Sequence, residues 1–162
     1  QELLPREAAP SRRAELAYNR GLAHGWADDA AAAADDFTEA LRWANQAAGS
    51  GLGVRRAALL GRGIARIDTG AIPAAYLDFI EALALESERT TPADTLELRL
   101  GLLATTRDPV GTDATRWQRE AAAAHDRAGA SADMVLLGWP ARFEKAGRRW
   151  PSTIPTPSAA VP

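Results

Sequence analysis

Arginine and aspartate recur in this chain at a spacing that could build ion pairs. Arg20 and Asp36 form one pair, and Arg62 and Asp78 form a second pair with the same interval between its members. Guanidinium and carboxylate groups form strong hydrogen bonds when two helices bring them together. Since such a pair recurs wherever the backbone recurs, we expect two structural bridges between paired helices.

The arginines also allow an alternative interpretation, in which they bind an anion. Arg55, Arg62 and Arg66 are separated by seven and four positions, so they share one face of a helix. The alternative function is a regulatory helical domain that binds nucleic acid or a small anionic ligand through its Arg-rich faces. Its candidate anion contacts are Arg62, Arg66 and Arg99. A net charge of −2 supplies no overall field for nucleic acid, which is not the partner we expect.

Groups suited to catalysis or metal binding are scattered along the sequence. The two histidines, His24 and His125, have no metal-ligand spacing, and the chain has no cysteine to complete a site. The carboxylates form no motif that would place two of them around a scissile bond. A small-molecule sensor or an enzyme would need a closed pocket around His24. We therefore expect a protein that is not an enzyme, with no catalytic residues, no metal and no cofactor.

Four landmarks recur in the same order and at the same spacing in two stretches of the chain. They are Gly21, Ala33, Phe37 and Ala40 in the first stretch, and Gly63, Ala75, Phe79 and Ala82 in the second. A small residue lets the next helix approach closely, and the aromatic of that next helix fills the space beside the contact. In a third, fainter stretch Gly101 and Trp117 keep the interval between glycine and aromatic. A repeat of this length predicts stacked helical units.

The two clear stretches resemble tetratricopeptide repeats. The first reads AYNRGLAHGWADDAAAAADDFTEAL and the second reads AALLGRGIARIDTGAIPAAYLDFIEAL. Gly70, just before the second helix of its unit, and the Ala-Leu pairs at 40–41 and 82–83 belong to the resemblance, which covers residues 14–128. It implies an all-α protein, a right-handed solenoid of antiparallel helix pairs with about three repeats and a C-terminal capping helix.

The chain departs from this family in three respects. The interval between corresponding positions, such as Gly21 and Gly63, is longer than the usual period of about 34 residues. His24 and Arg66 stand where an aromatic is expected, and the proline that often closes a unit is missing. These differences affect the expected curvature of the solenoid and leave the expected fold class unchanged.

Composition and capping residues place the individual helices. Alanine and leucine dominate the 46% hydrophobic content and favour helix over strand. The expected helices span residues 11–27, 30–47, 53–69, 72–87, 92–107 and 112–128, and a last one from 131 that is interrupted at 139–140 and resumes to 148. Ser11, Thr91 and Ser131 are the expected N-caps, and Gly70 and Gly129 are expected to end helices.

The resemblance implies that the first helix of each unit lines a concave groove. By matching positions, the lining residues are Tyr18, Leu22, Trp26, Leu60, Ile64, Ile67, Leu98 and Leu102. This apolar lining suits an amphipathic helix or an extended apolar segment of a partner protein, with the three candidate arginines setting its register. The alternative for each residue is packing between units, because apolar residues at helical spacing are often core. The favoured function is a non-catalytic protein–protein interaction module, an adaptor or assembly subunit of a larger complex.

The C-terminal part allows two interpretations. Trp139 and Trp150 flank the cationic segment 141–149, a pattern that could bind single-stranded nucleic acid or lipid headgroups. We favour a helix laid across the last repeat with Trp139 and Phe143 buried, since the end of a solenoid needs covering. The repeat domain would then cover residues 11–149.

The two ends of the chain are expected to be arms. Residues 1–10 form the N-terminal arm, and residues 150–162 form a proline-rich arm that could bind a partner. Because the chain begins at Gln1 rather than methionine, a leader or upstream sequence is expected to be missing. No apolar run reaches the length of about 20 residues that crosses a bilayer. Among 19 basic residues only Lys145 is a lysine, as in G+C-rich genomes. The glutamine, glutamate and prolines near the start suit the mature end of an exported bacterial protein, so we expect a bacterial protein, with the periplasm or cell envelope preferred slightly over the cytoplasm.

Overall fold

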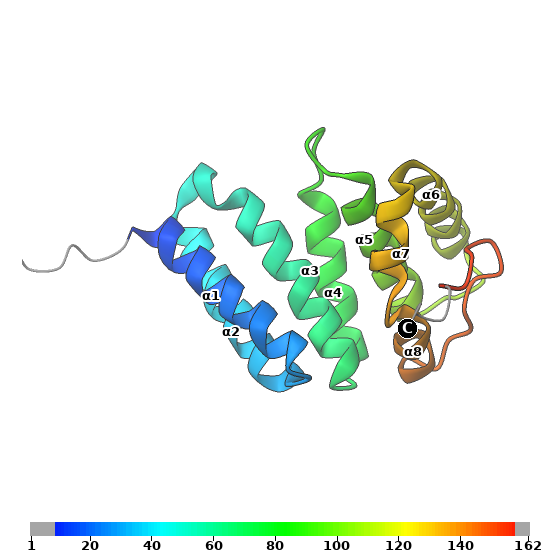
Figure 1. The fold of residues 1–162 in the computed structure, drawn as a ribbon, viewed down its shortest axis with the longest axis horizontal. Coiled ribbons are helices and arrows are strands. Elements are labelled where there is room, and N and C mark those ends of the chain that lie inside the picture. The colour runs from blue at the N-terminus through cyan, green and yellow to red at the C-terminus, as the bar shows by residue number, and fades with distance from the viewer. Residues whose placement is uncertain (1–8, 158–162) are drawn as a thin grey trace, which may run out of the picture.

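The computed structural model describes residues 9–157, and all regular secondary structure in this part of the chain is helical (Figure 1). The elements are α1 (Pro10–Trp26), α2 (Ala30–Gln46), a short 3-10 helix η1 (Ala48–Gly51), α3 (Leu52–Asp68), α4 (Ile72–Ala84), α5 (Pro92–Thr105), α6 (Thr112–Ala128), α7 (Ala130–Leu136) and α8 (Trp139–Lys145). The expected all-α class is confirmed. Residues 1–8 and 158–162, which belong to the two expected arms, lie outside the described residues.

Helices that follow one another in sequence pack against one another, so the chain forms a row of helix pairs. The pair α1–α2 lies at one end of the row, α3–α4 lies in the middle, and the later helices lie at the other end (Figure 1). Helix α3 also contacts α1 and α5. We call the surface that α1, α3 and α5 share the inner face.

In the first pair, a buried phenylalanine is held between glycines of two neighbouring helices. A Cβ atom added at Gly21 of α1 would lie 2.8 Å from the ring of Phe37, and one added at Gly61 of α3 would lie 2.7 Å from it. Both distances are too short for a side chain. The ring of Phe37 therefore sets how closely α1 and α3 lie beside α2, and the expected contact between Gly21 and the aromatic of the following helix is confirmed.

The second pair repeats this arrangement. Phe79 is fully buried, and a Cβ atom at either Gly63 of α3 or Gly101 of α5 would lie 2.6 Å from its ring. In the third pair, Trp117 of α6 is buried and its ring lies 6.2 Å from that of Tyr76, measured between centroids. The Phe37 ring of α2 thus contacts both α1 and α3, and the Phe79 ring of α4 contacts both α3 and α5.

Replacing Gly101 with alanine tests this packing. Overfilling the core costs about 1–3 kcal/mol, and the better helix propensity of alanine returns about 1 kcal/mol, so we expect a net loss of up to about 2 kcal/mol. Gly53→Ala is the matched control, because Gly53 lies in α3 with open space beside it, and it should not destabilise the protein. Urea unfolding followed by helical circular dichroism measures both. Equal stability of the two variants would contradict the packing role of Gly101.

The expected ion pairs link the helices within the pairs. Arg20 Nε donates to Asp36 Oδ1 at 2.7 Å, and Arg62 Nη2 donates to Asp78 Oδ1 at 2.7 Å. Arg66 Nη1 also donates to Asp78, through Oδ2 at 2.6 Å. The structural interpretation of both repeated pairs is confirmed, with Arg66 as an additional donor.

The helix ends follow local capping chemistry, with two corrections. Thr91 and Asp94 form the reciprocal capping box at the start of α5, as expected for Thr91. Ser11 is not a cap, because α1 already begins at Pro10, and proline suits the first position of a helix. Ser131 is not a cap either, because α7 begins at Ala130, directly after Gly129.

Helix α4 also ends earlier than expected. It stops at Ala84 rather than 87. The Ser87 amide donates to Thr90 Oγ1 at 3.0 Å, and the Arg89 amide donates to Ser87 Oγ at 3.3 Å. These side chains supply local partners that compete with the helical hydrogen bonds.

The C-terminal helices fold back onto the row of pairs. Trp139 and Phe143 of α8 are buried, as is Ile154 beyond it, which confirms the interpretation of this region as a packed helix. Trp150 Nε1 donates to the carbonyl of Ile154 at 2.9 Å. The described part of the expected C-terminal arm, residues 150–157, therefore packs on the helical body. No helix among residues 9–157 is long and apolar enough to cross a membrane.

Candidate functional site

The residues predicted to line the groove fall into two groups. Four of them belong to the hydrophobic core: Leu60, Ile67, Leu98 and Leu102. Their assignment to an open groove is corrected, because α5 is covered by α7 and α8, and α8 also packs on α3. The expected capping helix covers part of the inner face as well as the end of the row. The other four, Tyr18, Leu22, Trp26 and Ile64, remain at least partly exposed.

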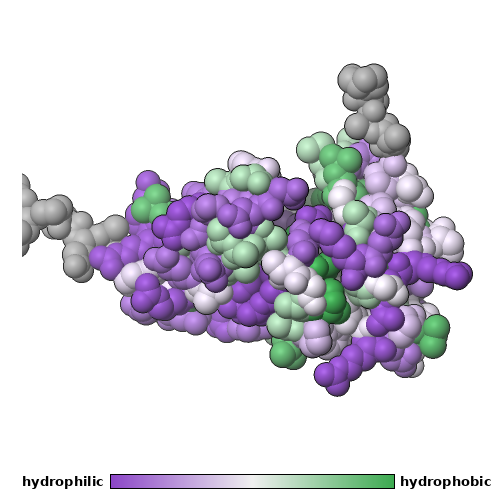
Figure 2. Space-filling view, turned by 90° about the horizontal axis from the view of Figure 1, so that it is seen from below, coloured by the Kyte–Doolittle hydropathy of each residue, from purple (hydrophilic) through white to green (hydrophobic). Residues whose placement is uncertain are grey.

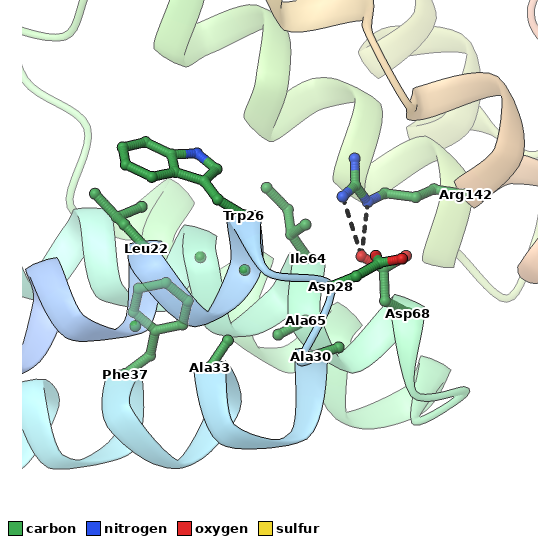
Figure 3. A pocket seen from close by; sticks show the side chains of 13 residues that line it. Leu22, Trp26, Asp28, Ala30, Ala33, Phe37, Ile64, Ala65, Asp68 and Arg142 are labelled. Atoms are coloured by element: carbon green, nitrogen blue, oxygen red, sulfur yellow. Dashed lines mark hydrogen bonds and ion pairs between the residues drawn. The ribbon is translucent and has the colours of Figure 1, made fainter.

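Three of these four residues line a pocket of about 190 Å³ on the open part of the inner face (Figure 3). Leu22 and Trp26 come from α1, and Ile64 comes from α3. Its other apolar lining residues are Ala30, Ala33, Phe37 and Ala65, with Gly21, Gly25 and Gly61 between them. Tyr18 lies outside the pocket and packs against Phe37, with 5.7 Å between the ring centroids. The glycines that admit the Phe37 ring thus also keep the pocket open.

Trp26 is the most unusual residue of this pocket. It is 84% exposed, although it is a large apolar side chain at the end of α1. Water around an exposed indole is released when a partner covers it, which favours binding. Tryptophan is also among the residues that contribute most to protein interfaces. The position of Trp26 therefore suits an anchor for a bound molecule.

The polar residues of the pocket lie opposite Trp26 and were missed by sequence analysis (Figure 3). Arg142 of α8 donates to Asp68 Oδ2 at the end of α3 through Nε at 3.2 Å and Nη2 at 3.0 Å. Lys145 Nζ donates to Asp68 Oδ1 at 2.9 Å. Asp28, in the turn between α1 and α2, is the other carboxylate of the pocket. No periodic pattern could bring α8 to α3, since 74 residues separate Asp68 from Arg142.

The arginines predicted to contact an anion already bind carboxylates. Arg62 and Arg66 both bind Asp78. Arg99 is buried in α5, where it binds Glu86 at 2.9 Å and Glu120 at 2.5 Å. An anion at these positions would have to compete with a carboxylate for each guanidinium group.

The inner face also contains a titratable carboxyl that sequence analysis did not identify. Burial raises the pKa of Glu97 in α5 to about 7, with nearby Arg142 opposing this shift and Asp94 reinforcing it. Burial also raises the pKa of Tyr18, and Glu97 and Asp94 reinforce that shift by repelling its anionic form. Both residues are partly buried, Tyr18 on α1 and Glu97 on α5.

The Glu97 pKa predicts a pH dependence of stability. The folded state holds this proton up to about pH 7, whereas an ordinary glutamate releases it near pH 4.5. The contribution of this bound proton to the free energy of unfolding is therefore complete below pH 4.5. It is lost as the pH rises through 7, and the loss amounts to up to about 3 kcal/mol. Glu97→Gln keeps the shape and removes the titration, so its stability relative to the wild type should increase between pH 5 and 8. Urea unfolding across this range tests the prediction, and parallel pH profiles would contradict it.

Neither histidine lies in a site that could hold a metal. His24 Nε2 lies 3.6 Å from Asp36 Oδ2, and His125 Nδ1 lies 3.5 Å from Asp126 Oδ1. Within residues 9–157 no group of three or more histidine, aspartate and glutamate side chains is arranged to bind a metal ion.

Comparisons with protein-family models, curated proteins and solved structures found no match.

Proposed function

We propose that this chain is a tetratricopeptide-like, right-handed solenoid of about three helix pairs that acts as a non-catalytic protein-binding module. A helix or an extended segment of a partner protein would bind the part of the inner face between α1 and α3. The module would serve as an adaptor or assembly subunit of a larger complex. The observation that carries this proposal is the exposed indole of Trp26 beside an apolar pocket.

The face of the molecule seen in Figure 2 is consistent with a localised interface. Figure 2 views the molecule from below and shows mostly hydrophilic residues, with hydrophobic residues exposed in small groups on that face. Large obligate interfaces are more continuous and more hydrophobic than this. A limited contact centred on one anchor fits such a surface better.

The alternative, binding of nucleic acid or a small anion through arginine, receives less support. Its candidate donors Arg62, Arg66 and Arg99 are held by carboxylates. The pairs of Arg62 and Arg66 with Asp78 join α3 to α4, and the pair of Arg99 with Glu120 joins α5 to α6. Releasing one of these arginines would therefore also weaken the fold. Salt-dependent binding of an oligonucleotide to the full chain would favour this alternative.

Trp26→Ala tests the proposed function. We expect partner affinity to fall about 30-fold, the effect of removing a strong interface anchor, while Tm stays unchanged because the side chain is exposed. Affinity purification of the full chain from its native source, with mass spectrometry, identifies the partner, and titration of that partner measures the affinities.

Leu77→Ala is the matched control. Leu77 is another exposed large apolar residue, on α4 and outside the pocket, so its removal should leave partner affinity unchanged. Equal retention of the partner by both variants would exclude the pocket as the binding site.

A further inference from the structure

We propose that the pocket beside Trp26 recognises a basic amphipathic segment of a partner protein. One large apolar side chain of that segment enters the pocket, and a neighbouring lysine or arginine binds the carboxylate of Asp28. This inference rests on the proposed binding function and adds the chemistry of the partner.

The size of the pocket favours one side chain over a small-molecule ligand. Its volume of about 190 Å³ is below the range of about 300–1,000 Å³ that is usual for small-molecule sites. Its walls are mainly alanine, glycine and the larger apolar residues Leu22, Phe37 and Ile64. An aliphatic or aromatic side chain suits such walls, since it brings no polar group that would lose its water.

The charges at the polar end of the pocket favour a cation. Asp68 already binds Arg142 and Lys145. Asp28 is exposed, and its carboxylate has no hydrogen bond or ion pair within the described part of the chain. Asp28 is therefore the pocket carboxylate that is available to a cationic side chain of a partner.

The backbone at Asp28 adds a second observation. Asp28 has a φ of +64°, in the left-handed region. Its amide donates to the Gly25 carbonyl at 3.2 Å, and the next amide, of Asp29, donates to the His24 carbonyl at 2.9 Å. This is the Schellman arrangement that ends many helices, in which the left-handed residue is usually glycine.

The corresponding turn of the next pair does contain glycine. Gly70 corresponds to Asp28 in the repeat, just as Gly63 corresponds to Gly21, and it has a φ of +82°. Its amide donates to the Ile67 carbonyl at 2.9 Å, and the Ala71 amide donates to the Arg66 carbonyl at 2.7 Å. The same turn therefore uses glycine in one pair and aspartate, at a conformational cost, in the other.

Capping of α2 does not account for the carboxylate at position 28. Asp29 already supplies this cap, because its Oδ1 accepts the Ala32 amide at 3.1 Å. A residue kept in a costly conformation beside a pocket fits a role in binding.

Helix α8 shows that the inner face accepts a helix of the proposed kind. Trp139 and Phe143, one turn apart, bury their rings against the body of the protein. Arg142 and Lys145 of the same helix bind Asp68. Since Arg142 also lines the pocket, a partner segment there would continue this surface toward α1 with the same combination of apolar and cationic side chains.

Display of random dodecapeptides against the full chain tests the inference. Binders that fail to bind Trp26→Ala define the pocket, and we expect them to carry lysine or arginine within one helical turn of an aromatic or aliphatic side chain. Asp28→Asn removes the charge and keeps a residue that tolerates the left-handed conformation, so it should weaken these peptides about 10-fold. Asp28→Lys should shift the selection toward acidic peptides.

The failures of the two proposals are distinguishable. Trp26-dependent peptides that lack basic residues and bind Asp28→Asn equally well would overturn the inference and leave the proposed function standing. If selection yields no Trp26-dependent peptide, both are overturned.

Thermal unfolding of Asp28→Gly is an independent readout. Relief of the left-handed aspartate should raise Tm by about 2–4 °C while affinity for the selected peptides falls. A lower Tm would show that Asp28 serves the fold and would overturn its assignment to binding.

Discussion

The packing of one aromatic ring between two glycines sets the arrangement of the helices in this protein. Phe37 and Phe79 each contact a glycine of the helix before and of a helix after, so each ring joins three helices. Because a ring cannot yield within a dense core, these contacts determine the separation of α1, α3 and α5. The inner face that those helices share, and the pocket between α1 and α3, follow from that separation.

The C-terminal helices then divide the inner face into a covered and an open part. Helix α8 lies over α5 and reaches α3, where Asp68 holds Arg142 and Lys145. The covered part contributes Leu98 and Leu102 to the core. The open part keeps the exposed side chain of Trp26. The border between the two parts is formed by the ion pairs of Asp68 with Arg142 and Lys145.

Ion pairing between side chains determines which charged groups remain available at the surface. The arginines of the repeats are bound by Asp36, Asp78, Glu86 and Glu120. Their positive charge is thereby compensated within the protein, where these ion pairs contribute to the fold. At the open pocket the uncompensated group is the carboxylate of Asp28, so the electrostatic preference there is for a cation. A series of basic residues in the sequence therefore does not make a basic binding site.

Local propensity and a repeated spacing were enough to predict the helical class, most helix boundaries and the contacts of Gly21 and Arg20 with the next helix. They could not predict which apolar residues stay exposed. Leu22 and Leu102 each follow a glycine of the repeat, yet Leu22 lines the open pocket and Leu102 is buried, because α8 covers α5 and leaves α1 open. The raised pKa of Glu97 and the meeting of Asp68 with Arg142 have the same origin. Both require segments far apart along the chain to pack together, and such packing depends on the shape of the whole molecule rather than on any local pattern.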